Sequence, residues 1–175
     1  MLRFMLALLF FIITGCTGIP DNIQPVKSFD ADKYLGKWYE IARLDHSFER
    51  DLDNVTAEYT LLKDGGIKVL NKGFSKTNNE WQDAQGKAYF VRGSDEGYLK
   101  VSFFGPFYGS YIIFELEKEN YEYAFVSGPD KSYLWFLSRT PQVSKQLIVY
   151  FIQKTQTLGF NTDELIFVEH NKIGK

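Results

Sequence analysis

Residues suited to metal binding, disulfide formation and nucleic-acid binding are scarce in this sequence. It has one cysteine, Cys16, so no disulfide can form within the chain. Its two histidines, His46 and His170, are far apart in the sequence and have no second cysteine to join them, so we expect no metal site. Twenty Lys and Arg residues stand against 22 Asp and Glu, without the basic excess of a nucleic-acid-binding protein. We therefore predict no metal and no nucleic-acid partner.

The motifs of several common enzyme classes are also missing. The sequence has no Gly-x-Ser-x-Gly motif, because the stretch from Gly93 to Gly97 has Asp95 at its centre. It has no Gly-x-Gly-x-x-Gly motif or phosphate-binding loop either. His46 lies beside Asp45 and is interpreted as a polar surface residue. These absences predict that the protein is not an enzyme and uses no cofactor.

The long apolar run of this chain lies at its N-terminus and is too short to cross a bilayer. Leu6 to Ile13 is uninterrupted, and Arg3 is the only charged residue before Asp21. A short apolar run behind a positive charge is typical of an export signal. We therefore predict that residues 1–15 are a signal peptide and take no part in the folded protein.

The signal ends in a sequence that resembles the bacterial lipobox. Ile13 is followed by two small residues and then by Cys16, the position that receives the lipid in such proteins. The resemblance implies acylation of Cys16, a lipidated tether over residues 16–27 and a folded domain over residues 28–175. The alternative is an ordinary signal peptide followed by a buried cysteine.

Aromatic residues are abundant, at 17% of the chain, and favour strands. From Val55 to Leu61 apolar and polar residues alternate, which predicts a half-buried strand, and the turn at Asp64 to Gly66 leads into the next one. Short turns separate the further runs. Eight consecutive strands predict an all-β fold, an antiparallel up-and-down β-barrel, since closure removes the exposed sheet edges. The predicted strands are 37–43, 55–61, 67–71, 83–92, 98–104, 110–118, 121–127 and 132–138.

One C-terminal α-helix follows the predicted barrel. Thr140 is placed to cap this helix, Pro141 suits its first position, and Gly159 ends it. Its apolar stripe is expected to pack against the barrel, although such a stripe is also compatible with a partner. A short final strand is predicted over residues 165–168. The stripe consists of Val143, Leu147, Ile148, Phe151, Ile152 and Leu158.

Three motifs in sequence order resemble those of the lipocalins. Gly36-Lys37-Trp38 matches the Gly-x-Trp motif at the first strand, and Gly128-Pro129-Asp130 matches the second motif before the eighth strand. Arg139, just before the helix, is similar to the third. Three further segments narrow the resemblance to the bacterial outer-membrane lipoprotein lipocalins: Phe48 to Arg50, Gly86 to Phe90 and Lys100 to Gly109.

This resemblance implies a function and a location. Members of the subgroup bind fatty acids or phospholipids, so the expected ligand is a fatty acid or a lysophospholipid, held for storage or transport in membrane maintenance. The implied location is the outer membrane of a bacterial cell, lipid-anchored and facing the periplasm, and the subgroup suggests a homodimer. Tyr108 and Trp135 match positions associated with ligand. Gly36, Trp38 and Arg139 are implied to be structural.

Strand direction predicts which residues meet at each end of the barrel. If the first strand runs from a closed base to an open mouth, the loops after strands one, three, five and seven surround the mouth. Arg139 then lies at the base with Trp38, and its guanidinium can stack on the indole. Aromatic and basic side chains are expected around the mouth: Phe48, Phe74, Trp81, Phe104, Phe107 and Tyr108, with Arg50, Lys76 and Lys131.

The same alternation predicts the wall of a cavity, because every second residue of a strand points inward. Small residues at Ala57 and Ala88 leave room for a ligand. Glu40 is also expected inside, where an isolated anion is costly, so it should be paired, hydrogen-bonded or protonated. The predicted ligand-binding residues are Tyr108, Trp135, Tyr59, Tyr133, Phe90, Val101 and Tyr111. The other inward positions are Ala42, Val55, Val69, Asn71, Leu99, Ile113 and Leu137.

Two alternatives to a lipid carrier remain at this point. One is an interaction lipoprotein whose barrel is filled by its own side chains and whose aromatic rim docks a partner. The other is an enzyme of the same fold that acts on an oxidised or isoprenoid lipid, with Glu40 as its general base.

Overall fold

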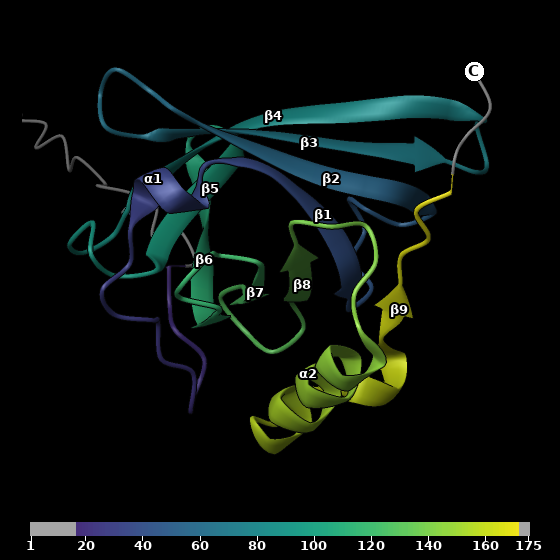
Figure 1. The fold of residues 1–175 in the computed structure, drawn as a ribbon. Helices are drawn as coiled ribbons and strands as arrows, with labels where there is room; N and C mark the ends of the chain where they lie inside the picture. Colours follow the sequence, from purple (N-terminus) through teal and green to yellow (C-terminus); the bar gives the residue numbers. More distant parts are fainter. Residues whose placement is uncertain (1–16, 172–175) are drawn as a thin grey trace, which may run out of the picture.

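The computed structural model describes residues 17–171, which form a closed antiparallel barrel flanked by one long helix (Figure 1). The strands pair in the order β2-β3-β4-β5-β6-β7-β8-β1, and β1 also pairs with β2, which closes the barrel. The predicted eight-stranded barrel, helix and final strand are confirmed. The barrel strands are β1 (Gly36–Arg43), β2 (Leu52–Leu61), β3 (Ile67–Ser75), β4 (Glu80–Phe90), β5 (Tyr98–Phe104), β6 (Phe107–Leu116), β7 (Tyr123–Ser127) and β8 (Leu134–Ser138).

Three short or helical elements complete the fold. A single helical turn, α1 (Ala31–Tyr34), precedes β1, and Asp30 caps it by accepting from the amides of Asp32 and Lys33. After β8 come α2 (Lys145–Thr157), a 3₁₀ turn (Thr162–Glu164) and β9 (Ile166–Phe167), which pairs with Ala42 and Arg43 at the end of β1. None of the helices among residues 17–171 is long and apolar enough to cross a membrane.

The start of α2 differs from the prediction. The helix begins at Lys145, and Ser144 caps it through its side chain, which accepts from the amide of Leu147. Thr140 is unavailable as a cap because its hydroxyl donates to the carbonyl of Gln142 in the turn after β8, at 2.8 Å. The predicted end is correct, since Gly159 follows the helix with φ +85°, a conformation that favours glycine.

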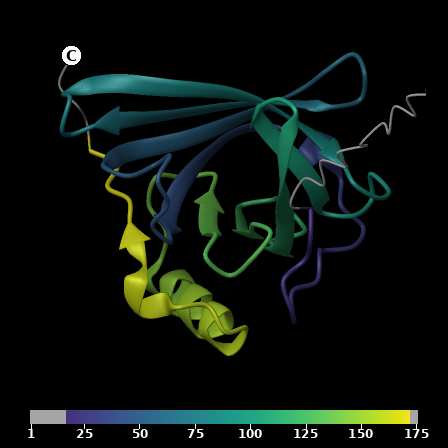
Figure 2. The same cartoon turned by 180° about the vertical axis from the view of Figure 1, so that it is seen from behind.

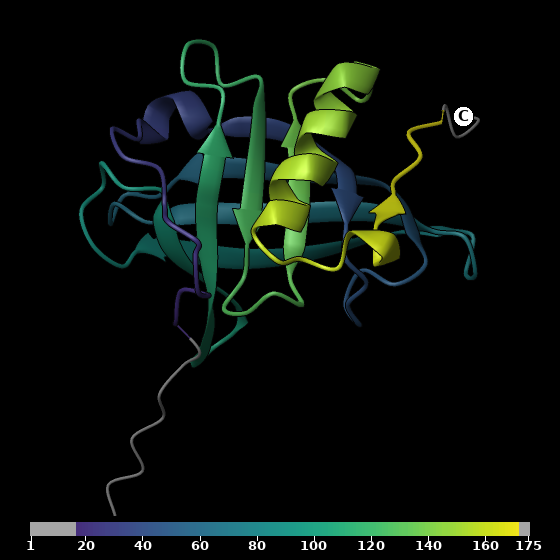
Figure 3. The same cartoon turned by 90° about the horizontal axis from the view of Figure 1, so that it is seen from below.

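Two apolar clusters form the core, one inside the barrel and one outside it. The inner cluster contains Trp38, Tyr59 and Leu137 among others. The outer cluster lies between the barrel and α2, where Phe151 contacts Phe125 of β7 and Phe136 of β8. Figure 3 shows α2 lying across the outside of these two strands. The apolar stripe of α2 therefore packs on its own barrel, as predicted.

The base of the barrel is closed by an arginine stacked on a tryptophan. The guanidinium carbon of Arg139 lies 3.9 Å from the ring centre of Trp38, which is fully buried. Arg139 also donates to the carbonyls of Lys37, Lys33 and Tyr121, at 2.9, 2.6 and 3.2 Å. Gly36 has φ +89°, and a Cβ there would lie 3.6 Å from the Arg139 guanidinium. The predicted meeting of Trp38 and Arg139 is confirmed.

The segment predicted as a tether packs against the barrel over its described part, residues 17–27. The backbone of Val26 pairs with Ile113 and Gly97, and Ser110 donates to the carbonyl of Gly18 at 2.6 Å. Gly97 permits this contact, because a Cβ there would lie 2.8 Å from Val26. Figure 2 shows this purple segment on the same side of the barrel as β5 and β6. Residues 17–27 are thus part of the folded unit. The predicted signal peptide and Cys16 lie outside the described residues.

Candidate ligand-binding cavity

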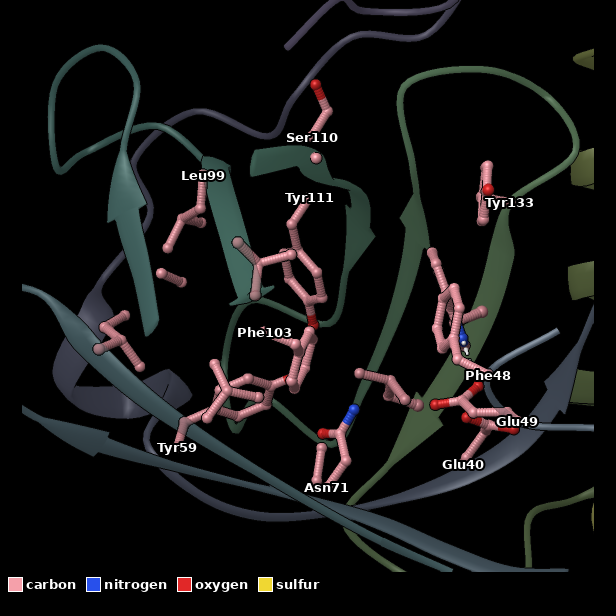
Figure 4. A pocket seen from close by; sticks show the side chains of 18 of the residues that line it. Glu40, Phe48, Glu49, Tyr59, Asn71, Leu99, Phe103, Ser110, Tyr111 and Tyr133 are labelled. Carbon is pink, nitrogen blue, oxygen red and sulfur yellow. Dashed lines mark hydrogen bonds between the residues drawn. The ribbon is translucent and has the colours of Figure 1, made fainter. Parts of the chain in front are cut away.

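The barrel encloses a cavity of about 430 Å³ that opens at the mouth (Figure 4). Its wall is mainly aromatic and aliphatic, and Ala57 and Ala88 contribute small side chains, as predicted. The barrel is therefore not filled by its own side chains, and an eight-stranded barrel with such a void is wide enough for one small ligand. Most predicted inward residues line it: Val55, Ala57, Tyr59, Val69, Asn71, Ala88, Leu99, Val101, Tyr108, Tyr111, Tyr133, Trp135 and Leu137.

Three predicted inward residues do not line this cavity. Phe90 packs in the inner cluster near Phe29, at 6.2 Å between ring centres, and Ile113 is buried in the same cluster. Ala42 is wrong as an inward residue, because it belongs to the outer cluster. The reason is a β-bulge between Glu40 and Ala42, which shifts the pairing with β8 and turns the following residues to the opposite face.

Three tyrosine hydroxyls form the polar floor of the cavity. The hydroxyl of Tyr111 lies 2.7 Å from that of Tyr34 and 2.8 Å from that of Tyr59. Burial raises the pKa of each of the three hydroxyls above its usual value, so all three stay protonated at neutral pH. Each of these three buried hydroxyls therefore has a hydrogen-bond partner inside the barrel, as buried polar groups generally do.

Aromatic residues from four loops and strands surround the mouth. Tyr133 and Trp135 are stacked, with their ring centres 6.0 Å apart, and Phe48 stacks near Tyr133 from the β1–β2 loop. Phe107 and Tyr108 line the cavity at the start of β6. The other three predicted rim aromatics do not line it: Phe74 and Trp81 form an edge-to-face pair on the β3–β4 hairpin, and Phe104 lies at the end of β5.

A buried cluster of ionisable side chains lies in the wall near the mouth. Arg43 donates to Oε1 of Glu40 at 2.8 Å and to the backbone carbonyl of Glu49 at 2.7 Å. The Glu49 carboxylate in turn accepts from Nε1 of Trp135 at 3.1 Å, and Nε2 of His46 lies 3.1 Å from it. All four ionisable side chains are less than 8% exposed. The expected pairing of Glu40 is confirmed.

The prediction that His46 is a polar surface residue is wrong. Its side chain is only 4% exposed, and its ring stacks on Phe48 with 4.1 Å between ring centres. The reason lies in the β1–β2 loop, which folds back so that His46 and Glu49, three residues apart, face each other. The sequence of a loop does not indicate which of its polar residues will be buried.

The two carboxyl groups of the cluster have opposite pKa shifts. Burial and the nearby Glu49 carboxylate raise the pKa of Glu40 well above its usual value, although Arg43 counteracts this. The pKa of Glu49 is lowered: burial acts against this, but the hydrogen bonds and charge of His46 and the Trp135 indole prevail. Of the two carboxyl groups, Glu40 is therefore the one that binds a proton more readily.

A pH dependence of stability follows for Glu40. Its pKa is raised in the folded state, so between about pH 4.5, the unfolded value, and the raised pKa the folded protein binds more protons than the unfolded chain. The free energy of unfolding should therefore fall as pH rises through this window. Glu49 adds no slope there, because it is ionised in both states. The Glu40→Gln variant should show a flatter profile in urea unfolding from about pH 5 to 8; an unchanged slope would contradict this assignment.

The basic residues expected at the rim are engaged elsewhere. Arg50 pairs with Asp45 at 2.6 Å, and Lys76 pairs with Asp53 at 3.0 Å. The ammonium of Lys131 lies beside Gly159 at the end of α2. Among the described residues, no Lys, Arg or His side chain lines the cavity. Also within residues 17–171, no group of three or more His, Cys, Asp or Glu is placed to hold a metal ion.

Several cavity residues were not identified from the sequence. Glu49, which lines the cavity, and Arg43, which contacts Glu49 without lining the cavity, depend on the fold of the β1–β2 loop, for which the sequence carries no periodic signal. Tyr34 and Phe103 line the cavity as well. Tyr34 comes from α1 beneath the barrel. Phe103 shares a face of β5 with Leu99 and Val101, so the alternation that predicted those two residues could also have identified it.

The sequence is similar to a known family and to named relatives. The family model of the lipocalin-like domain matches residues 29–170. Outer membrane lipoprotein Blc of Vibrio cholerae is 60% identical over 158 residues, which cover 90% of this chain and 92% of the relative. The protein of the same name from Escherichia coli K12 is 46% identical, covering 91% and 90%.

Solved structures with low sequence identity share the fold. Insecticyanin from the tobacco hornworm Manduca sexta superposes with a TM-score of 0.68 at 20% identity, covering 89% of this chain and 88% of the other. The cockroach allergen Per a 4 gives a TM-score of 0.65 at 20% identity, covering 83% and 90%. These similarities concern the barrel and its flanking helix.

Proposed function

Because the chain belongs to the lipocalin family, as an outer-membrane lipoprotein of a bacterial cell, we propose that its barrel holds fatty acids or lysophospholipids for storage or transport in membrane maintenance. The proposed role is binding, without catalysis. The single observation that carries it is the cavity of about 430 Å³, walled by apolar side chains and open at one end.

The chemistry of the wall favours a ligand that enters with its acyl chain first. Burying apolar surface contributes roughly 25 cal/mol per Å², or about 0.8 kcal/mol per CH₂ group. Within residues 17–171, no cationic side chain lines the cavity to meet an anionic group, and the acidic residues that line it are Glu40, Glu49 and Asp130. The acyl chain therefore lies in the interior and the polar head group stays at the mouth.

Anchoring of the protein is proposed to occur through acylated Cys16. A single acyl chain binds membranes weakly, whereas several chains together give stable attachment. The diacyl and amide-linked chains of a bacterial lipoprotein meet this condition, and the signal over residues 1–15 would be removed first. The predicted homodimer is a separate proposal, and sedimentation of the detergent-solubilised protein tests it.

The proposed ligand contacts are tested most clearly at Trp135, which lines the cavity and is held by Glu49. Replacing Trp135 by Ala should weaken lysophospholipid binding by about 1–3 kcal/mol, the scale of one buried aromatic side chain. Isothermal titration with a lysophospholipid below its critical micelle concentration measures this change. Trp81 provides a matched control, because it is 56% exposed on the β3–β4 hairpin and lines no part of the cavity. Equal affinity of Trp135→Ala and wild type would contradict the proposed site.

A further inference from the structure

The barrel wall has an opening beside the mouth. β4 pairs with β5 only from Lys87 to Phe90. Its first seven residues, 80–86, pair with β3 alone. A second cavity of about 320 Å³ lies in this gap. It shares Val101, Phe103 and Phe107 with the ligand cavity, so the two spaces adjoin. The gap between β4 and β5 therefore adjoins the ligand cavity.

Exposed phenylalanines surround this opening. Phe104 is 83% exposed, Phe107 63% and Phe48 58%, and all three line the second cavity. We call this group the aromatic edge. Single exposed apolar residues are common on soluble proteins, but three large ones around one opening mark a contact with an apolar partner. The aromatic edge lies at the mouth end, since Phe104 and Phe107 flank the β5–β6 turn.

The N-terminal segment reaches the same end of the barrel. Gly18 is held there by Ser110, and the position of a Cβ on Gly18 lies 4.0 Å from the carbonyl of Pro129 in the β7–β8 loop. Tyr98 donates to the carbonyl of Thr17. Figure 3 shows the segment running along β6 toward this end. Gly18 therefore lies at the mouth end of the barrel.

The charges near the mouth favour an apolar contact over an electrostatic one. Arg50 and Lys76 are each paired with a carboxylate, and Lys72, which lines the second cavity, faces Asp83 across the β3–β4 pair, so no net positive charge marks the opening. An apolar contact depends little on ionic strength, because salt screens only interactions between charges.

From these observations we propose that the aromatic edge lies against the surface of the phospholipid bilayer that holds the protein, and that lipid ligands enter the barrel through the opening between β4 and β5. This proposal rests on the proposed acylation of Cys16, which fixes the mouth end close to the bilayer. It assigns a role in membrane contact to Phe104, which does not line the ligand cavity, and to Phe48 and Phe107, which line both cavities.

The single cysteine makes the contact measurable, because an acylated Cys16 leaves no free thiol. A Phe104→Cys variant of the full chain is labelled with a nitroxide and reconstituted into phosphatidylethanolamine–phosphatidylglycerol vesicles. Leu61→Cys and Val149→Cys are matched controls, each 51% exposed, at the end of β2 near the base and on α2. We expect molecular oxygen to relax the label at 104 more strongly than a water-soluble nickel complex does, and the reverse at 61 and 149. Equal nickel accessibility at 104 and 61 would overturn the proposal.

A kinetic experiment tests the entry path separately from ligand binding. Transfer of a fluorescent lysophospholipid from vesicles to the protein should slow at least threefold in Phe104→Ser and stay at the wild-type rate in Leu61→Ser. The dissociation constant in solution should change less than twofold in both variants. A wild-type transfer rate in Phe104→Ser would overturn the entry path while leaving the binding function intact. Failure of wild type to bind the probe, or to float with vesicles, would instead contradict the proposed ligand or the acylation.

Discussion

Replacing Ala57 by Phe is expected to reduce lysophospholipid affinity at least tenfold, which corresponds to about 1.4 kcal/mol. Ala57 lies in β2, is 8% exposed and faces the cavity. A phenyl ring at this position occupies space that the acyl chain needs. The barrel should remain folded, because the added ring enters a void rather than a packed region. Isothermal titration measures the affinity, and circular dichroism verifies the fold.

Thr60 provides the control for this substitution. It lies three residues further along the same strand, is exposed, and pairs with Lys68 of β3. Thr60→Phe adds a ring outside the barrel and should leave the affinity unchanged. If Ala57→Phe bound the lipid as tightly as Thr60→Phe, the ligand would not occupy the space in front of β2.

Replacing Arg43 by Met should cause the largest loss of stability, about 3–5 kcal/mol, as expected when one partner of a buried ion pair is removed. The Arg43 side chain is 2% exposed and donates to Glu40 and to the carbonyls of Glu49 and Leu52. These acceptors lose their donor in the variant. Urea unfolding monitored by fluorescence gives the change in the free energy of unfolding.

The cost of Arg43→Met should depend on pH and on Glu40. Without Arg43, Glu40 can avoid a buried charge only by keeping its proton, so the loss should be greater at pH 8 than at pH 5. The double variant Arg43→Met/Glu40→Gln should lose less stability than the sum of the two single variants. Arg50, in an exposed pair with Asp45, is the control, and Arg50→Met should have a much smaller effect. Similar losses in the two arginine variants would contradict a buried cluster.

The parts of the fold that the sequence predicts well are those governed by periodicity. Alternation of apolar residues predicted the positions of the strands. The number of strands between Trp38 and Arg139 then predicted that these two residues lie at the same end of the barrel. The same alternation identified Tyr59, Val101 and Trp135 as cavity residues. These predictions succeed because side-chain direction in a regular strand depends only on position along it.

The errors arise where periodicity is interrupted or where a loop determines the contacts. The bulge after Glu40 turns the side chain of Ala42 to the outside of the barrel, and no residue type nearby indicates this bulge in the sequence. His46 and Glu49 became buried because their loop folds over the barrel wall. The cap of α2 is Ser144 and not the predicted Thr140. Both residue types are good caps, and only the turn after β8 decides between them.

The most direct test of a hollow barrel that holds an acyl chain is a crystal structure of the protein with a lysophospholipid brominated in its chain. We predict an anomalous bromine peak inside the cavity, near Tyr59 of β2 and Trp135 of β8, which both line its wall. Bromine peaks confined to the outer surface, with the interior containing only water, would contradict it.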